Sequence, residues 1–426
     1  MSQQKKPNTV FRVLVASLAG TTIEFFDFYI YATAAVLAFP KLFFPTSDPT
    51  SGRLQSLATF ALAFFSRPLG SALFGHFGDR IGRKATLVAS LMTMGLCTVA
   101  IGLLPVYATI GVAAPILLCL FRFGQGIGLG GEWGGAILLA TENAPAGKKA
   151  WYGMFPQLGA PLGFTLSSVV FLVIGSAYSG QQLLSVGWRL PFIFSLLLVG
   201  IGLYVRLKIF ETPDFVKVIE NNERAKFPLG DVFTKYGKPL ALGTLITILV
   251  FLFFYLITVF ALSWGTTVLM YTRSGFLEAQ LVSMIFFAAG IILSAALAGR
   301  FGQLNMLLLS SIVIFFFGLF FSKMFIAGNW PLLAIFLSGA MFLIGFNYGP
   351  LGTALASLFP APVRYTGASL AFTLAGILGG SLTPYFATSI AGHYGLAYVG
   401  YYLCGTAVLS CIALVVAKSF LRKNAA

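Results

Sequence analysis

Five charged side chains lie well inside long apolar stretches of the sequence, away from their ends, where an ionised group is costly unless it faces water or a partner charge. They are Glu24, Asp27, Arg67, Arg122 and Glu132. Three carboxylates against two guanidiniums leave one acid without an obvious cationic partner. Removal from water disfavours the charged form of a carboxyl group, so a spare acid is suited to carry a proton. Asp27 and Glu132 are the leading carriers, and the alternative is that two carboxylates share one arginine.

Two of these charges belong to the glycine-rich stretch 121–135, FRFGQGIGLGGEWGG. The spacing of Arg122, Gln125 and Glu132 places them on one helical face. Ten residues of helix span about 15 Å, so Arg122 and Glu132 need partners from other helices. A guanidinium engages carboxylates bidentately, which makes Arg122 the candidate for binding an anion. The face is either a substrate or ion pathway or a buried structural ion pair. Small residues let neighbouring membrane helices approach closely; here they are Gly124, Gly126, Gly128, Gly130, Gly131, Gly134 and Gly135.

The first apolar stretch carries Glu24, Asp27 and Tyr31 at helical spacing, so two acids and a phenol share a face. Arg67, directly before Pro68, is expected to hold Asp27 or Glu24. Tyr31 either contacts a substrate or is a packing aromatic with a hydrogen-bonded hydroxyl.

Further polar candidates lie in later stretches. Gln157 stands between Pro156 and Pro161, where a broken helix would expose backbone groups for binding. Tyr255 and Asn347 are expected at a cavity, with ordinary core packing as the alternative. The predicted substrate-binding residues are Tyr31, Arg122, Gln125, Gln157, Tyr255 and Asn347. The predicted proton-coupling residues are Glu24, Asp27, Arg67 and Glu132.

These residues must be positioned by membrane helices. Of the 426 residues, 58% are hydrophobic and 9% are charged, whereas about 25% charge is ordinary for a soluble domain. The sequence therefore predicts an all-α, polytopic membrane protein with twelve transmembrane helices in two six-helix bundles. The apolar runs are 12–38, 54–75, 86–104, 110–141, 151–175, 188–208, 239–265, 280–300, 305–325, 331–357, 366–391 and 396–417. The predicted domains are a bundle at 1–208, a cytoplasmic linker at 209–238 and a bundle at 239–426.

Most of the 27 Lys and Arg residues fall on one side of these runs. Because basic loops stay in the cytoplasm, both termini are expected to be cytoplasmic. The net charge of +15 thus reflects topology, and nucleic acid is not expected as a partner. The four cysteines lie in apolar runs and are expected to be reduced. We expect no metal site and no cofactor, and the sequence lacks an ATP-binding signature.

A basic segment follows the second run, Gly78-Asp79-Arg80-Ile81-Gly82-Arg83-Lys84. Its Arg-x-Gly frame returns after the eighth run as Arg300-Phe301-Gly302. The two halves of the chain are therefore expected to be weak repeats, an arrangement that places binding sites near the membrane midplane.

Several segments together resemble one transporter family. GHFGDRIGRKATL (75–87) resembles the signature loop of the major facilitator superfamily. GTTIEFFDFYIY (20–31), RPLG within 64–84, RFGQGIGLGGEWGGA (122–136), GWRLPF (187–192), ETPDF (211–215) and VRYTGAS (363–369) resemble its metabolite:proton symporter branch. That branch includes carriers for proline and betaine, α-ketoglutarate, citrate and shikimate.

The resemblance implies proton-coupled symport of a small polar or anionic metabolite by alternating access. It also implies a multi-pass monomer of the bacterial inner membrane that is not an enzyme. Open alternatives are a uniporter or antiporter, or a transport-inactive sensor that retains the fold. The resemblance further assigns Gly78, Asp79, Arg80, Gly82 and Arg83 to a conformational gate. In this implied gate, the Asp79 carboxylate interacts with the positive N-terminus of the eleventh helix, near 365–367, when the carrier faces outward.

The sequence departs from the family pattern in two places. Gly299, Gln303 and Leu304 stand where relatives repeat charged residues after the eighth helix. Ser357 stands where relatives often carry a glutamate. We therefore expect a weaker cytoplasmic charge latch in the second half.

Overall fold

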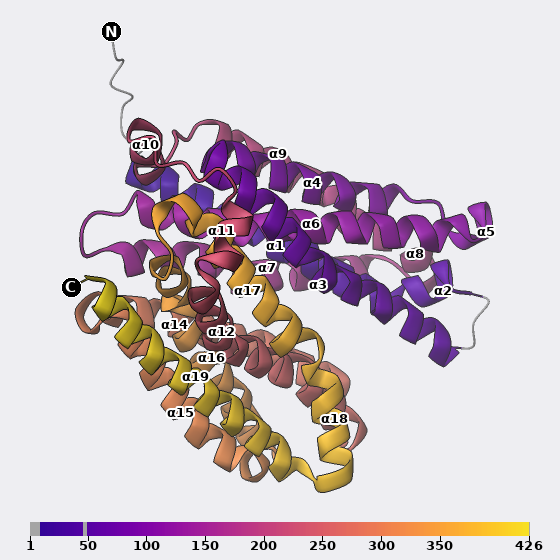
Figure 1. Cartoon of the computed structure of the whole chain (residues 1–426). Coiled ribbons are helices and arrows are strands. Elements are labelled where there is room, and N and C mark those ends of the chain that lie inside the picture. Colours follow the sequence, from indigo (N-terminus) through magenta and orange to yellow (C-terminus); the bar gives the residue numbers. More distant parts are fainter. Residues whose placement is uncertain (1–8, 46–48, 426) are drawn as a thin grey trace. The chain divides into compact units, whose positions relative to one another are not determined.

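The computed structural model describes residues 9–45 and 49–425 as an array of helices (Figure 1). Twelve of the described helices are long and apolar enough to cross a membrane, and each matches a predicted run. In chain order they are α1 (Val10–Leu37), α3 (Pro49–Arg80), α4 (Arg83–Leu103), α6 (Ala113–Glu142), α7 (Lys149–Ala177), η1 with α9 (Gly187–Arg189, Leu190–Leu207), α12 with η2 and α13 (Gly237–Tyr255, Leu256–Phe260, Ala261–Thr267), α14 (Arg273–Phe301), α15 (Gln303–Met324), α16 (Trp330–Ser357), η3, α17, η4 and α18 (Ala361–Val363, Arg364–Ala375, Gly376–Ser381, Thr383–Tyr394) and α19 (Leu396–Ala425). The short helices are α2 (Phe39–Phe43), α5 (Tyr107–Ile110), α8 (Gly180–Ser185), α10 (Pro213–Glu220) and α11 (Pro228–Thr234).

The chain forms two compact units. The first unit comprises Met1–Asn143 and Leu158–Leu229, and the second comprises Ala144–Gln157 and Gly230–Ala426. The division falls inside α7, whose first turns pack with the second unit. The segment predicted as a linker, 209–238, contains the two short helices α10 and α11.

Glycines on α6 let this helix contact its neighbours at backbone distance. A side chain at Gly126 would overlap the backbone of Ala63 on α3, and one at Gly130 would overlap Arg67 on the same helix. Gly128, on the other side of α6, lies against Met94 of α4. The glycine-rich sequence thus allows α6 to pack tightly between α3 and α4, as small residues do in membranes.

Glycines also allow two helices of the second unit to pack at backbone distance. Gly345 and Gly349 of α16 lie against the backbone of Phe287 and Ile291 on α14. Gly290 of α14 in turn faces the backbone of Phe342 on α16. Close packing of two long helices through glycine is therefore common to both units.

Two glycines join consecutive helices at equivalent places. Gly82 links α3 to α4 with φ +131°, and Gly302 links α14 to α15 with φ +86°. A residue with a side chain is strained at such angles. The recurring Arg-x-Gly frame in the sequence is thus matched by a recurring backbone conformation.

The helix breaks are not where the prolines suggested. α7 runs without interruption through Pro156 and Pro161, so the expectation of a broken helix at Gln157 was wrong. Each proline lacks one N–H, but neighbouring helices support the turn in a membrane protein. The irregular turns are instead the π-helical segments η2 and η4 of the second unit.

The carbonyls loosened at η2 are bonded by a side chain from another helix. Gln280 of α14, 2% exposed, donates its amide to the carbonyls of Ile257 at 2.9 Å and Thr258 at 3.2 Å. Because π-helical turns disturb the regular backbone ladder, this amide stabilises an otherwise weak point of the seventh span.

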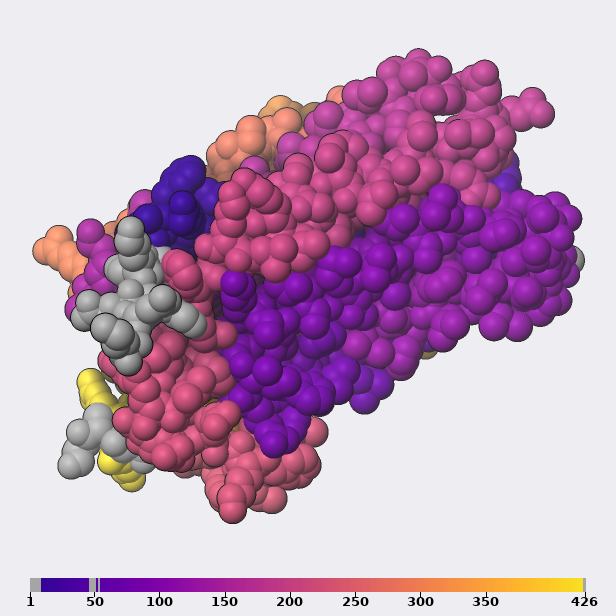
Figure 2. All heavy atoms as spheres, turned by 90° about the horizontal axis from the view of Figure 1, so that it is seen from above, coloured from indigo at the N-terminus to yellow at the C-terminus, as the bar shows by residue number. Residues whose placement is uncertain are grey.

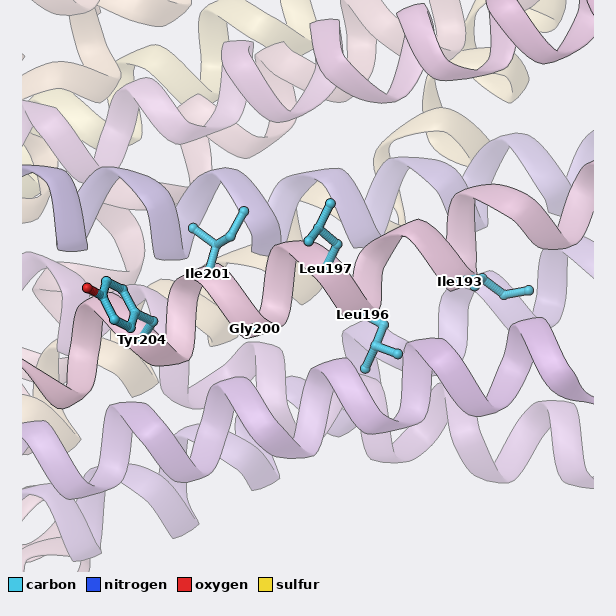
Figure 3. A pocket seen from close by; sticks show the side chains of 6 residues that line it. All are labelled: Ile193, Leu196, Leu197, Gly200, Ile201 and Tyr204. Atoms are coloured by element: carbon cyan, nitrogen blue, oxygen red, sulfur yellow. The ribbon is translucent and has the colours of Figure 1, made fainter.

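The outer face of α9 is apolar and open. Figure 3 shows its shallow hollow, in which side chains project from a single helix around Gly200. In the space-filling view α9 and α4, which pack together, lie side by side on the surface of the first unit (Figure 2). An exposed apolar face is what lipid requires of a spanning helix. The hollow is lined by Ile193, Leu196, Leu197, Gly200, Ile201 and Tyr204.

Candidate functional site

The buried charges of the first unit include one that the sequence count omitted. Arg206, at the cytoplasmic end of the predicted run 188–208, lies in the last turn of α9, is 2% exposed and forms an ion pair with Glu132. Its guanidinium also donates to the carbonyl of Leu87 at 2.7 Å. Ser90 of α4 donates to the other oxygen of Glu132 at 3.3 Å. Glu132 therefore has a full set of partners, as in the structural alternative.

This ion pair is enclosed by α1 as well. A side chain at Gly20 would overlap both the Arg206 guanidinium and the Glu132 carboxylate. The pair thus joins α6 to α9 directly beneath the backbone of α1. Protonating Glu132 would leave the charge of Arg206 buried without compensation, which is unfavourable.

Glu24 and Arg67 form a looser pair. Their nearest oxygen and nitrogen are 3.6 Å apart, and the side chains are 2% and 9% exposed. The guanidinium lies over the rings of Phe28 and Phe64, at 5.0 and 5.7 Å. Among the described residues, Glu24 Oε2 and Arg67 Nε find no hydrogen-bond partner. Of the two acids that Arg67 was expected to hold, the structure selects Glu24.

Asp27 differs from both other acids because hydroxyl groups, and no arginine, hold it among the described residues. Ser195 of α9 donates to Oδ1 at 2.6 Å, and Thr98 of α4 donates to Oδ2 at 2.8 Å. The carboxylate is fully buried. Within residues 9–45 and 49–425, no basic nitrogen comes within ion-pair distance of it. Asp27 is thus the acid that the sequence count left without a cation.

Arg122 lies among aromatic rings. Its guanidinium is 3.9 Å from the ring centre of Tyr31, 5.0 Å from that of Phe60 and 5.4 Å from that of Phe28. Ring faces attract a cation, and more strongly when water is excluded. The side chain is fully buried and donates to the amide oxygen of Gln125, its neighbour on the predicted face.

A continuous chain of hydrogen bonds joins Arg122 to Asp27. Gln125 accepts from Arg122 and donates through Nε2 to the hydroxyl of Thr98 at 2.7 Å. Thr98 then donates to Asp27. The sequence identified Arg122, Gln125 and Asp27 but missed Thr98 and Ser195. Isolated hydroxyl residues in an apolar run carry no signal that separates such partners from ordinary helix residues.

Tyr31 has the environment of a packing aromatic. It is fully buried in a cluster with Phe39 and Trp188, and its hydroxyl is bonded to that of Thr59 at 2.6 Å. Its ring also lies against Arg122. The structure therefore assigns Tyr31 a supporting contact with the guanidinium.

The candidates in the second unit are neutral. Gln157 donates to the carbonyl of Tyr348 at 2.8 Å, which joins α7 to α16. Asn347 donates to Ser310 at 2.7 Å, and its own Oδ1 has no partner in the part of the chain that the structure describes. Tyr255 is 8% exposed and ends α12 directly before η2. These side chains can offer hydrogen bonds to a ligand but no charge.

Two of the predicted gate residues, Asp79 and Arg83, form a compact ionic cluster with Glu142 in the first unit. Arg83 is fully buried, 3.1 Å from the carboxylate of Asp79 and 3.5 Å from that of Glu142. It also donates to the carbonyl of Gly78 at 2.8 Å and covers the ring of Phe215. The signature loop is therefore mostly helical, because Asp79 belongs to α3 and Arg83 to α4.

A third acid completes the cluster from a distant part of the chain. Glu211 accepts from the backbone N–H groups of Arg83 and Lys84, at 3.0 and 3.3 Å. It thereby caps the N-terminus of α4, where N–H groups lack helical partners and negative charge is favoured. A side chain at Gly82 would collide with this carboxylate. Arg80 is exposed. Sequence reasoning missed Glu142 and Glu211, although the motif at 211–215 could have indicated the second.

Comparison with known proteins places this arrangement in a family. The model of the family described as "Sugar (and other) transporter" matches residues 12–235. The chain belongs to this family. An inner membrane metabolite transport protein of Escherichia coli (strain K12) is 52% identical over 409 residues, covering 95% of this chain and 93% of that protein. The transporter is thus a multi-pass inner membrane protein and not an enzyme.

Other relatives carry more specific names. A shikimate transporter of Escherichia coli (strain K12) is 33% identical, covering 96% of this chain and 94% of that protein. A proline/betaine transporter of the same strain is 30% identical, covering 96% and 83%. These matches confirm the family resemblance read from the motifs.

The fold is confirmed by solved structures. A proton:xylose symporter of the major facilitator superfamily matches with a TM-score of 0.75 and 16% identity, covering 97% of this chain and 96% of that one. The transporter therefore has the twelve-helix major facilitator fold. Transport by this family requires a small-molecule substrate and a membrane.

Proposed function

We propose that the transporter is a symporter that takes up a small metabolite bearing a carboxylate together with protons. In this proposal Asp27 carries the proton and Arg122 binds the substrate carboxylate. The observation that supports it is the difference among the three acids that the sequence places inside the apolar runs, Glu24, Asp27 and Glu132. Glu24 and Glu132 each face an arginine, whereas Asp27 is held by two hydroxyls.

A carboxylate held by hydroxyls can be protonated without a large electrostatic penalty. A hydroxyl both donates and accepts, so Ser195 and Thr98 can serve either form of Asp27. Protonating Glu24 or Glu132 would instead leave a buried arginine uncompensated. Of the two carriers that the sequence left open, the geometry therefore favours Asp27.

The substrate class follows from Arg122 and from the relatives. Arg122 is the cation on the same hydrogen-bond chain as Asp27, and a guanidinium pairs well with a carboxylate. Shikimate, proline and betaine, in the names of the relatives, all bear a carboxylate. Gln125 completes the proposed anion site, with Tyr31 behind the guanidinium. Gln157, Tyr255 and Asn347 are proposed to supply neutral contacts.

Alternating access is the proposed mechanism, with the ionic cluster around Arg83 as part of the gate. Asp79, Arg80 and the glycines at 78 and 82 belong to the same segment. We also propose that both termini are cytoplasmic and that the transporter works as a monomer. A uniporter, or an antiporter that exchanges metabolites, would need no proton carrier. The environment of Asp27, which suits a proton carrier, therefore argues against these two alternatives.

The test uses the purified full chain in liposomes with an imposed pH gradient. Uptake of labelled shikimate, proline, betaine and a panel of organic acids is measured together with proton movement. We expect wild type to accumulate at least one carboxylate-bearing compound with proton entry, and Asp27→Asn to abolish accumulation while exchange persists. Glu220→Gln, at an exposed position on α10, is the matched control. Proton-driven uptake that persists in Asp27→Asn would refute the proposal.

A further inference from the structure

We propose that Thr98 and Gln125 form a neutral relay through which the protonation state of Asp27 controls how firmly Arg122 is held. The inference rests on the proposed function, since it concerns the same acid and the same guanidinium. It adds two positioning residues that lie on different helices and that neither carry charge nor move protons to the substrate.

The relay is defined by its three consecutive hydrogen bonds. Arg122 donates to Gln125, Gln125 to Thr98 at 2.7 Å, and Thr98 to Asp27 at 2.8 Å. All four side chains are buried to 0% exposure. Every donor points from the cation towards the anion, so each bond polarises and strengthens the next. The orientation of the Gln125 amide is thereby determined from both ends.

Thr98 can change its partner without moving. Its hydroxyl lies 2.8 Å from Asp27 Oδ2 and 3.0 Å from the carbonyl of Met94, but it has one proton to give. Ionised Asp27 attracts that proton. Protonated Asp27 becomes a donor itself, and the Thr98 proton then turns to Met94. The last bond of the chain no longer ends on an anion.

The surroundings of Asp27 make this relay its main link to a charge. The neighbouring helices α4 and α9 present the hydroxyls of Thr98 and Ser195. Glu24, one turn earlier on α1, is engaged by Arg67 of α3. Arg122 on α6 is joined to Asp27 through Gln125 and Thr98.

The consequence for transport is an order of events. Ionised Asp27 holds Gln125, and through it Arg122, in the arrangement seen here. Proton uptake weakens that hold and leaves the guanidinium with a larger uncompensated charge, so its affinity for an anion rises. Proton first and anion second is the order that couples the two in symport.

The test measures the coupling between Arg122 and Asp27 directly. In the purified full chain, infrared difference spectra recorded over a pH series report the carboxyl band that Asp27→Asn removes. The pH at half amplitude of this band is compared in wild type, Arg122→Gln, Gln125→Leu and the double variant. We expect each single change to raise this pH by about one unit, a tenfold gain in proton affinity.

The double variant decides between a relay and independent effects. A relay predicts a shift close to that of Gln125→Leu alone, because Arg122 loses its route once the amide is gone. Shifts that simply add, or a Gln125→Leu variant that titrates like wild type, would overturn the relay. A failure of the proposed function shows separately, as proton-driven uptake that persists in Asp27→Asn.

Thr98 has a matched control on its own helix. Thr93 also bonds its hydroxyl to a backbone carbonyl of α4, but at a half-buried position away from the relay. Thr98→Val should shift the Asp27 band in the same direction as Gln125→Leu, Thr98→Ser should restore it, and Thr93→Val should leave it unchanged. Equal effects of the two valine substitutions would contradict the relay.

Discussion

The two units of the transporter pack alike but have different polar interiors. In the first, ionic groups meet within the helices, as in the pairs Glu132–Arg206 and Glu24–Arg67. In the described part of the second, spanning helices bond through neutral groups, such as Asn347 to Ser310 and Ser311 to Ser410. Shared glycine packing with different chemistry indicates that the fold does not require buried charge. The glycine packing that both units share therefore does not explain the buried charges of the first unit.

The irregular helical turns lie in the opposite unit from the ion pairs. The π-helical segments η2 and η4 both belong to the second unit. π-helical turns are frequent at functional sites. The two units thus differ in two features: buried ion pairs join the helices of the first unit, and π-helical turns interrupt the helices of the second. Four substitutions test this difference, in order of decreasing effect.

The largest effect is expected from breaking the tight ion pair. Arg206→Leu leaves Glu132 buried without its cation, and we expect a loss of about 3–5 kcal/mol of stability. This loss of stability is measured by thermal unfolding in detergent, with dye labelling of the newly exposed cysteines as the signal. Glu132→Gln added to Arg206→Leu should recover most of the loss. Lys208→Leu, two residues on and exposed, is the control. If the Arg206→Leu protein is as stable as wild type, the ion pair does not stabilise the first unit, and this difference between the two units is lost.

The second effect concerns the π-helical turn. Gln280→Leu leaves the carbonyls of Ile257, which is buried, and Thr258, which is half-buried, without their side-chain donor, which should cost about 1–3 kcal/mol. The same unfolding assay applies, and hydrogen exchange should increase around 256–260 first. Gln181→Leu makes the same substitution at an exposed site. If η2 exchanges no faster in Gln280→Leu, the amide does not stabilise the bend.

A smaller effect is expected at the cap of α4. Glu211→Ala removes the acceptor of two N–H groups and should lower stability by about 1 kcal/mol, as the loss of a helix cap does. Hydrogen exchange at residues 83–86 gives the local measure. Glu220→Ala, at an exposed position of α10, should change nothing. Equal protection of α4 in both variants would show that Glu211 is dispensable for the cluster around Arg83.

The smallest effect is expected in the neutral interior of the second unit. Ser410 makes long contacts, 3.3 Å to the carbonyl of Ile246 and 3.5 Å to Ser311. Its loss in Ser410→Ala should cost less than about 1 kcal/mol. Unfolding midpoints of this variant and of Arg206→Leu, measured side by side, compare the two interiors. A Ser410→Ala loss as large as that of Arg206→Leu would abolish the distinction between them.

The sequence by itself determined the spans and the positions of most buried charges. Hydropathy is a local property, so twelve apolar runs predicted the twelve spanning helices. Helical periodicity placed Arg122 and Gln125 on one face, and the structure bonds them. Arg206 was not predicted to be buried, because basic residues at the end of an apolar run usually reach the membrane surface.

Tertiary structure decided which groups meet. Thr98 and Ser195 reach Asp27 from two other helices, and Glu211 reaches α4 from far along the chain. Such partners depend on how each helix is rotated about its axis, and packing against neighbours sets that rotation. Arg206 shows this most clearly, since the rotation of α9 beside Gly20 turns its side chain inward to Glu132. Spacing along one helix contains no information about that angle.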